Sequence, residues 1–147
     1  MLLQFVIGAI LIVLTVIIHA LVLDKLMHAL EENGARVFRM FRLFWKAAML
    51  VIAVMGVFCA HIIQIWVWAL FYLLVGALPN FEEALYFSTS TFTTVGFGDL
   101  VLTEQWRLVS SFQSANGFIL FGWSTAFIFE VMSKIYRDDN LRRSGKT

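Results

Sequence analysis

The stretch TTVGFGDL, residues 93–100, contains the residues best suited to chemistry in this chain. It combines two threonine hydroxyls, glycines at positions 96 and 98, and the carboxylate of Asp99. It is too polar and too rich in glycine for an ordinary membrane-spanning helix, although long apolar segments flank it. Backbone carbonyls at membrane depth must be hydrogen-bonded, buried in protein or exposed to a polar cavity. A dehydrated cation is a suitable partner for such carbonyls, so cation binding is the first hypothesis.

The overall composition indicates a membrane protein. Of the 147 residues, 61% are hydrophobic and 14% are charged, whereas soluble domains are about half apolar and about a quarter charged. The mean hydropathy is +0.84. The net charge of +1 argues against a nucleic-acid partner, and the single Cys59 excludes an intramolecular disulfide or a CxxC metal site.

Three apolar segments are long enough to cross the hydrocarbon core, which takes about 20 helical residues. The first occupies residues 1–23 and lacks the basic start of a secretory signal peptide. The second covers residues 47–78 and is closed by Pro79, and the third covers residues 106–133 and is less apolar. We therefore predict an all-α membrane protein with three transmembrane helices.

Residues 24–46 form a basic segment between the first two spans. We expect a break at Asn33-Gly34, followed by a short amphipathic helix at the membrane surface that binds anionic lipid. The segment is too short for a voltage sensor. The expected lipid-binding side chains recur every three residues and are Arg36, Arg39 and Arg42.

Residues 81–93, FEEALYFSTSTFT, are expected to form a helix that is too short to span the bilayer. Asn80 is a suitable N-cap, and Glu83 three residues later completes a capping-box pattern. The polar loop follows this helix directly. A short helix that enters the membrane, followed by a loop that returns to the same side, forms a re-entrant element.

The distribution of charge predicts the orientation of the chain. The 24–46 segment and the tail 136–147 are basic, whereas the region between the second and third spans has four acidic residues and Arg107 alone. Basic flanks remain on the cytoplasmic side. We therefore expect the N-terminus outside, the C-terminus in the cytoplasm, and an integral protein of the plasma membrane (the inner membrane in a bacterium).

Residues 94–98, TVGFG, resemble the TVGYG selectivity filter of tetrameric potassium channels, in which backbone carbonyls replace the hydration shell of K⁺. Four of the five residues are identical, and Phe97 takes the place of the tyrosine, another aromatic residue. The resemblance covers about residues 47–135, from an outer span through a pore helix and filter to an inner span. The first span is an extra N-terminal helix outside the resemblance.

This resemblance implies a potassium-selective channel that conducts passively, has no enzymatic activity, and needs no cofactor besides the permeant ions. It implies a four-fold homotetramer, because one loop supplies one quarter of each carbonyl ring. The implied K⁺ ligands are Thr94, Val95, Gly96 and Phe97, and Gly98 completes the filter.

The conformation of the filter follows from its task. Successive carbonyls point to one axis only if the backbone alternates between conformations, some with positive φ, which glycine adopts at little cost. Gly96 and Gly98 meet this requirement, and Thr94 adds a hydroxyl at the inner mouth. We expect the side chains of Val95 and Phe97 to point away from the axis, toward the pore helix.

Asp99 is expected at the outer mouth, where the resemblance implies that it bonds groups behind the filter and attracts cations. Phe97 lacks the hydroxyl of the corresponding tyrosine, so we expect a less tightly held filter. The expected supporting residues on and beside the pore helix are Tyr86, Phe87, Ser90 and Thr93.

The third span carries candidates for a cavity and a gate. One helical stripe is mostly polar, and we expect it to line the cavity below the filter, with hydrogen bonding between helices as the alternative. Its members are Gln113, Asn116, Leu120 and Ser124. Gly117 and Gly122 suit either a gating bend or close helix packing. Glu130 suits either the inner vestibule or an ion pair with Lys134.

His19 and His61 are titratable groups within spans, which makes them candidates for pH sensing. The alternative is a neutral histidine that bonds to a neighbouring helix. No spacing in the sequence supports a metal site that includes them.

Other functions compete with a potassium channel. The aromatic residue at position 97 argues against a weakly selective cation channel. A potassium-transporter subunit is disfavoured because such proteins resemble fused repeats with degenerate loops, whereas this chain has one intact filter loop. A non-conducting subunit that modulates another channel would use the first span and the basic segment 24–46 as its interaction surface. An unknown regulatory subunit is likewise a candidate partner.

Overall fold

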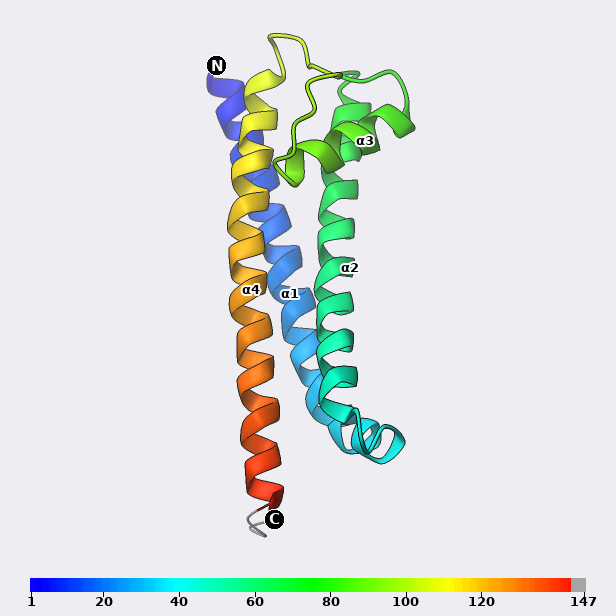
Figure 1. Cartoon of the computed structure of the whole chain (residues 1–147). Helices are drawn as coiled ribbons and strands as arrows, with labels where there is room; N and C mark the ends of the chain where they lie inside the picture. The colour runs from blue at the N-terminus through cyan, green and yellow to red at the C-terminus, as the bar shows by residue number, and fades with distance from the viewer. Residues whose placement is uncertain (144–147) are drawn as a thin grey trace.

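The computed structural model describes residues 1–143, and all regular structure within that range is helical (Figure 1). The helices are α1 (Leu2–Met40), α2 (Trp45–Leu74), α3 (Phe81–Phe92) and α4 (Arg107–Arg143). α1, α2 and α4 are each long and apolar enough to cross a membrane. The prediction of an all-α fold with three such helices is confirmed.

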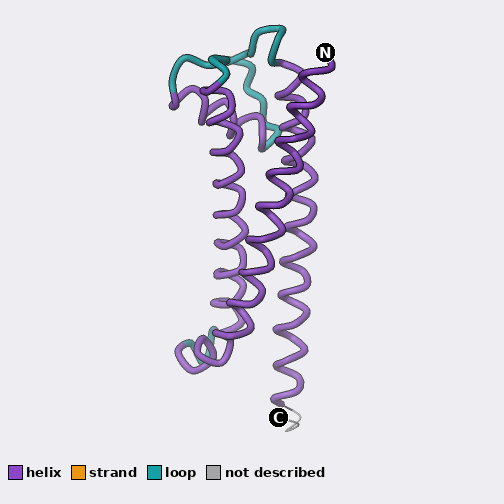
Figure 2. The backbone as a smooth tube through the Cα atoms, turned by 180° about the vertical axis from the view of Figure 1, so that it is seen from behind, coloured by secondary structure: helices purple, strands orange, loops and turns teal. Residues whose placement is uncertain are grey.

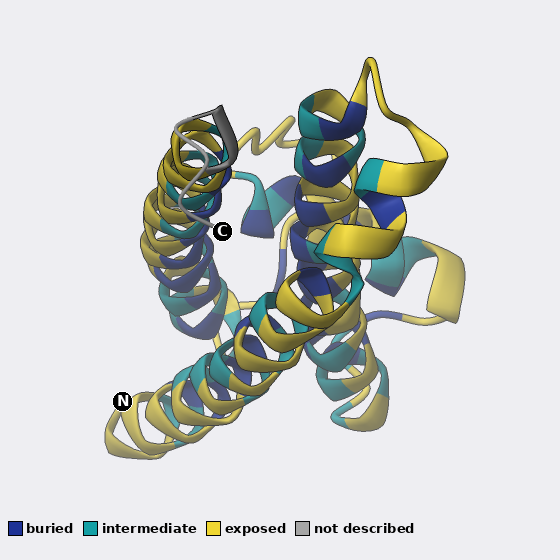
Figure 3. Cartoon of the chain, turned by 90° about the horizontal axis from the view of Figure 1, so that it is seen from below, coloured by how far each residue is buried: buried dark blue, intermediate teal, exposed yellow. Residues whose placement is uncertain are grey.

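The three long helices form an elongated bundle, and α3 lies at one end of it beside α2 (Figures 1 and 2). The N-terminus and the loops on either side of α3 share this end, which we call the loop end. The C-terminal end of α4 and the α1–α2 connection lie at the opposite, far end. Viewed along the bundle, α1 is inclined to its neighbours, and the buried residues face inward (Figure 3).

α1 does not break at Asn33-Gly34 but continues to Met40, so this prediction is wrong. The Asn33 amide donates to the Ala29 carbonyl at 2.8 Å, which stabilises the helical turn before the glycine. Leu30 and Val37 are buried on one face on either side of the pair. Their packing outweighs the helix penalty of one glycine, about 1 kcal/mol.

Because α1 has 39 residues, it is roughly 58 Å long, about twice the thickness of the hydrocarbon core. The basic segment is therefore the end of α1 and the turn before α2, rather than a separate surface helix. α4 likewise continues past the predicted end at residue 133 to Arg143. Residues 144–147 of the predicted tail lie outside the described residues.

α3 begins at the predicted N-cap, Asn80, and Glu83 bonds to it. The Asn80 side-chain oxygen accepts from the Glu83 backbone amide at 2.9 Å, and Asn80 Nδ2 donates to the Glu83 carboxylate at 2.9 Å. The second bond comes from the Asn80 side chain, whereas in a full capping box it comes from the backbone amide of the N-cap. Before this cap, the chain leaves α2 through Gly76, whose φ is +65°. The sharp turn directs α3 back along the bundle, so that its C-terminal end lies nearer the centre of the molecule (Figure 1).

The interior has two apolar clusters separated by a polar layer. The loop-end cluster includes Trp68, Tyr72, Phe92, Val109 and Leu120. The far-end cluster includes Leu30, Trp45, Met49, Val131 and Ile135. The polar layer contains His19, His61, Gln64 and Ser124, all buried.

Candidate functional site

The loop after α3 has an alternating backbone. Thr94, Gly96 and Gly98 have φ values of 61°, 56° and 80°, whereas the intervening Val95 and Phe97 do not have positive φ. Alternation of this kind turns successive carbonyls to the same side. The sequence anticipated positive φ at the two glycines but not at Thr94, where a β-branched residue is strained in this region.

The amides of this loop are bonded to the C-terminal half of α3. The Ser90 carbonyl accepts from the Val95 amide at 3.0 Å and the Gly96 amide at 3.2 Å. The Ser90 hydroxyl accepts from the Phe97 amide at 3.4 Å, near the limit for a hydrogen bond. Within residues 1–143, the carbonyls of residues 94–98 accept no such bond. The loop therefore presents free carbonyl oxygens while its amides are held from behind.

Asp99 and Phe97 both contact Tyr86 of α3. The Tyr86 hydroxyl donates to Asp99 Oδ2 at 2.7 Å, and the Tyr86 and Phe97 rings stack with centroids 6.3 Å apart. The Tyr86 hydrogen bond lowers the pKa of Asp99 below its ordinary value of 3.8. The same bond raises the pKa of Tyr86. One tyrosine thus fixes the loop at two points.

The other expected supporting residues have different positions. Thr93 caps α3, because its hydroxyl donates to the Thr89 carbonyl at 2.7 Å. Phe87 is buried and packs on Tyr72 with ring centroids 5.3 Å apart. It therefore belongs to the core beneath α3 rather than to the contact with Phe97.

The Tyr86–Asp99 bond has a testable pH dependence. Because the folded pKa of Asp99 is lowered, its stabilising contribution is present above the unfolded pKa and is lost as pH falls through the folded pKa. In Tyr86→Phe, we expect Asp99 to protonate at a higher pH, so the acid midpoint of ion flux shifts upward. Flux measured against the pH on the side that the loop end faces tests this. Tyr136→Phe, at the far end of α4, is the control, and an unchanged midpoint in Tyr86→Phe would contradict the assigned support.

The polar stripe of α4 does not line an open cavity in this subunit, so that prediction is corrected. Its four members are buried against other helices. Gln113 Nε2 donates to the Ser88 hydroxyl of α3 at 2.8 Å, and its side-chain oxygen accepts from Tyr72 of α2 at 2.9 Å. Asn116 donates to the Thr15 hydroxyl of α1 at 2.7 Å.

The two glycines of α4 have different surroundings. A Cβ at Gly117 would overlap the backbone carbonyl oxygen of Phe92, at the C-terminal end of α3. A Cβ at Gly122 would have no atom within 4 Å. Gly117 therefore permits close contact between α3 and α4, and α4 is continuous through both positions.

Glu130 does not pair with Lys134, which was one of its two expected roles. Lys134 forms its ion pair with Glu31 of α1 instead. Glu130 is exposed on α4. The ion pair therefore joins two helices rather than two turns of one helix.

The opposite face of α4 is a candidate pore-lining surface that the sequence reasoning missed. Phe118 and Phe129 expose 73% and 63% of their surface, and Gly122 and Thr125 between them are also exposed. These residues are spaced by four, three and four, which places them on one helical face. The spacing is visible in the sequence, but the polar stripe was the more prominent signal.

His19 and His61 are brought together although 42 positions separate them in the chain. Their rings lie with centroids 5.3 Å apart in the polar layer. Gln64 and Ser124 bond to both rings. Three of the four residues, His19, His61 and Ser124, were candidates from the sequence, but Gln64 and the grouping of all four into one cluster were not.

Three long apolar helices, a short helix at one end and a loop with free carbonyls define a membrane protein of the pore-loop class. The family model described as ion channel matches residues 57–134, which is more than half of the chain. The protein therefore belongs to this ion-channel family. The match runs from within α2 into α4 and leaves α1 outside. Neither the curated proteins nor the solved structures that were compared yield a match.

Proposed function

We propose that this ion channel is selective for potassium and that four copies form its conduction pathway. The observation that carries the proposal is the alternating backbone of residues 94–98, with amides bonded to α3 and carbonyls free. Carbonyl rings of this kind substitute for the water around a monovalent cation. The Thr94 hydroxyl adds a ligand at the inner mouth, and Asp99 attracts cations at the outer mouth.

The uncovered surfaces of one subunit support assembly around a shared axis. Val95 and Phe97 expose 55% and 70% of their surface. An open groove of about 450 Å³ lies between the loop and α4, lined in part by Thr94, Gly96 and Ser114. We propose that neighbouring copies cover these surfaces, since a single loop supplies only one side of each ion site.

The direction of α3 suits a cation pathway. Its C-terminal end carries the partial negative charge of the helix dipole, and this end lies at the inner end of the loop. We propose that the loop end faces outward and the far end faces the cytoplasm of the plasma membrane or bacterial inner membrane. Arg36, Arg39 and Arg42 would then contact anionic lipid at the cytoplasmic surface.

Purified protein in liposomes distinguishes the candidate functions. We expect K⁺ efflux that barium blocks, with Na⁺ flux much smaller under the same gradient. Equal Na⁺ and K⁺ flux would instead support the weakly selective channel. Absence of flux from protein that is folded and assembled would support the non-conducting subunit, and protein-free liposomes serve as the background.

A further inference from the structure

Four buried side chains from three helices form a closed ring of hydrogen bonds. Gln64 of α2 lies 2.8 Å from His19 Nδ1 of α1 and 3.1 Å from His61 Nδ1 of α2. Ser124 Oγ of α4 lies 3.2 Å from His19 Nε2 and 2.9 Å from His61 Nε2. Each imidazole therefore uses both of its nitrogens within the ring.

The hydrogen bonds of the ring fix the protonation state of both histidines. If the Gln64 amide donates to His19, then His19 Nε2–H donates to Ser124, the Ser124 hydroxyl donates to His61, and His61 Nδ1–H donates to the Gln64 oxygen. Reversing the Gln64 amide reverses every bond. In either direction both histidines are neutral and have opposite tautomers, because each accepts one bond and donates one.

An additional proton disrupts this arrangement. An imidazolium donates from both nitrogens, so the ring then has more donors than its four contacts can use. One donor must turn out of the ring, and a buried charge is left without a carboxylate partner. Protonation therefore weakens the contact among the helices.

The surroundings of the ring contain no opposite charge among the described residues. The two imidazoles face one another across the α1–α2 contact. α3 presents the Phe92 ring to His61, and α4 presents Phe121 to His61 and Trp123 to His19. The faces of aromatic rings attract cations. These three rings therefore offset part of the free-energy cost of burying a protonated imidazole.

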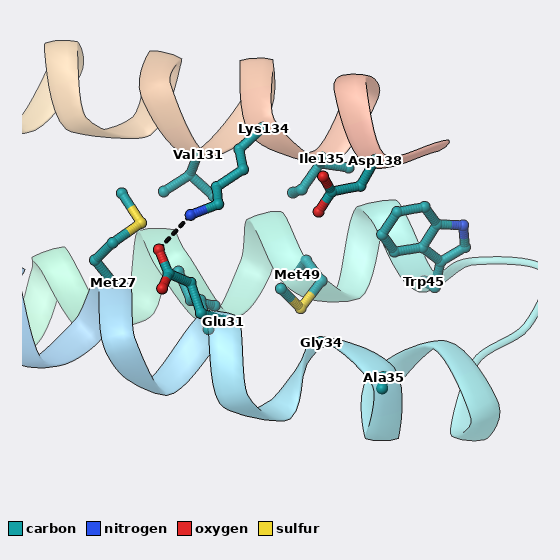
Figure 4. Close-up of a pocket in the computed structure, with 11 residues that line it drawn as sticks. Met27, Glu31, Gly34, Ala35, Trp45, Met49, Val131, Lys134, Ile135 and Asp138 are labelled. Atoms are coloured by element: carbon teal, nitrogen blue, oxygen red, sulfur yellow. Dashed lines mark hydrogen bonds and ion pairs between the residues drawn. The ribbon is translucent and has the colours of Figure 1, made fainter. Parts of the chain in front are cut away.

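The ring lies within the contact between α1 and α4. Toward the loop end, Asn116 of α4 bonds to Thr15 of α1 at 2.7 Å. Toward the far end, Lys134 pairs with Glu31 across a cavity of about 200 Å³ between α1, α2 and α4 (Figure 4). The far half of α4 is held by Val131 and Ile135 of the far-end cluster and by the ion pairs Lys134–Glu31 and Lys46–Asp139. The cavity beside these contacts leaves room for this half of α4 to shift.

We propose that the His19–Gln64–His61–Ser124 ring is a proton-binding site that fastens α1 to the far half of α4 while both histidines are neutral. Uptake of a proton opens the ring and lets α4 move relative to α1. The consequence for gating rests on the proposed channel function: acidification changes the open probability through α1, the helix outside the matched family region.

The first test uses ¹⁵N-histidine-labelled full-length protein in lipid. His28→Gln removes the exposed third histidine, which leaves the two ring imidazoles. At about pH 8, above the ordinary histidine pKa, nuclear magnetic resonance should show one Nδ1–H and one Nε2–H neutral tautomer. Two identical tautomers, or a charged imidazole at this pH, would overturn the ring.

The second test measures movement with spin labels on Glu32→Cys of α1 and Asn140→Cys of α4, both exposed, in a Cys59→Ala background. Labelled chains are diluted among unlabelled ones, so only distances within one chain are recorded. We expect the distance distribution to change as the pH falls from about 8 to about 4, because a buried imidazole without a carboxylate partner takes up a proton less readily than one in water. His19→Gln/His61→Gln should lose this change, and His28→Gln should retain it.

An unchanged distance in the wild-type sequence, or the same change in His19→Gln/His61→Gln, would overturn the proposal. If the double variant does not assemble, His19→Gln and His61→Gln are measured separately, and each should shift the pH midpoint. Flux recorded on the same samples separates the two proposals. A pH-dependent distance without K⁺ flux would support the proton site and contradict the potassium-channel proposal.

Discussion

Replacing Gly96 with alanine will reduce K⁺ flux by at least about 100-fold while the protein remains folded. Gly96 has a φ of 56°, and a Cβ there would have no atom within 4 Å. The cost is therefore backbone strain rather than a clash, about 1–2 kcal/mol for an L-residue in the left-handed region. In the proposed assembly of four copies on one axis this cost arises four times, and each 1.4 kcal/mol is about a factor of ten.

The strain at position 96 can be relieved if the backbone rotates. In the proposed filter, that rotation turns a carbonyl away from the shared axis and removes an ion ligand. Because the Gly96 amide is bonded to the Ser90 carbonyl at 3.2 Å, rotation also loosens the attachment of the loop to α3. Liposome flux and size-exclusion chromatography of Gly96→Ala measure the effect on conduction and on assembly separately.

Gly76 provides a matched control. Its φ is 65° and its Cβ position is equally open, so Gly76→Ala has a similar backbone strain in the loop after α2. We expect Gly76→Ala to lower the thermal midpoint slightly and to retain K⁺ flux. Similar flux in Gly76→Ala and Gly96→Ala would contradict a special role for the backbone at position 96.

Replacing Gly117 with alanine will destabilise the chain and abolish ion flux by displacing α3. The added methyl would overlap the Phe92 carbonyl oxygen, which is backbone and has no rotamer by which to move away. Overpacking of this kind typically costs about 1–3 kcal/mol. Relief requires α3 to move away from α4, which shifts the residues that hold the loop. Thermal unfolding in detergent and liposome flux measure the two effects.

Gly122→Ala tests whether the effect belongs to the α3 contact. The substitution lies five residues further along α4, where the methyl has no atom within 4 Å. An exposed helical glycine replaced by alanine gains up to about 1 kcal/mol of helix stability, so the thermal midpoint should stay or rise. Equal destabilisation by both substitutions would contradict the close-packing role of Gly117. Loss of flux in a stable Gly122→Ala would indicate a gating bend there.

The four helices were predictable because their signals are local. Apolar length identified α1, α2 and α4, and the Asn80–Glu83 pattern identified the start of α3. The continuation of α1 through Asn33-Gly34 was not predictable from local propensity. It depends on the burial of Leu30 and Val37 against other helices.

The role of the polar stripe depended on partners from a distant part of the chain. Thr15 bonds Asn116, and His19 bonds Ser124. If the position of α1 is not known, a polar stripe in a span is explained equally well by a water-filled cavity or by a neighbouring helix. The positive φ of Thr94 was also hidden, because the local preference of threonine opposes it and only the anchored loop imposes it.

The reversal potential of the purified protein in a planar bilayer, with K⁺ on one side and Na⁺ on the other, tests the central claim most directly. If four loops provide the carbonyl rings, current will reverse far from zero, toward the K⁺ equilibrium potential, and Gly76→Ala will behave identically. A reversal near zero would contradict the account, because carbonyl rings that replace the hydration shell of K⁺ would then not control permeation.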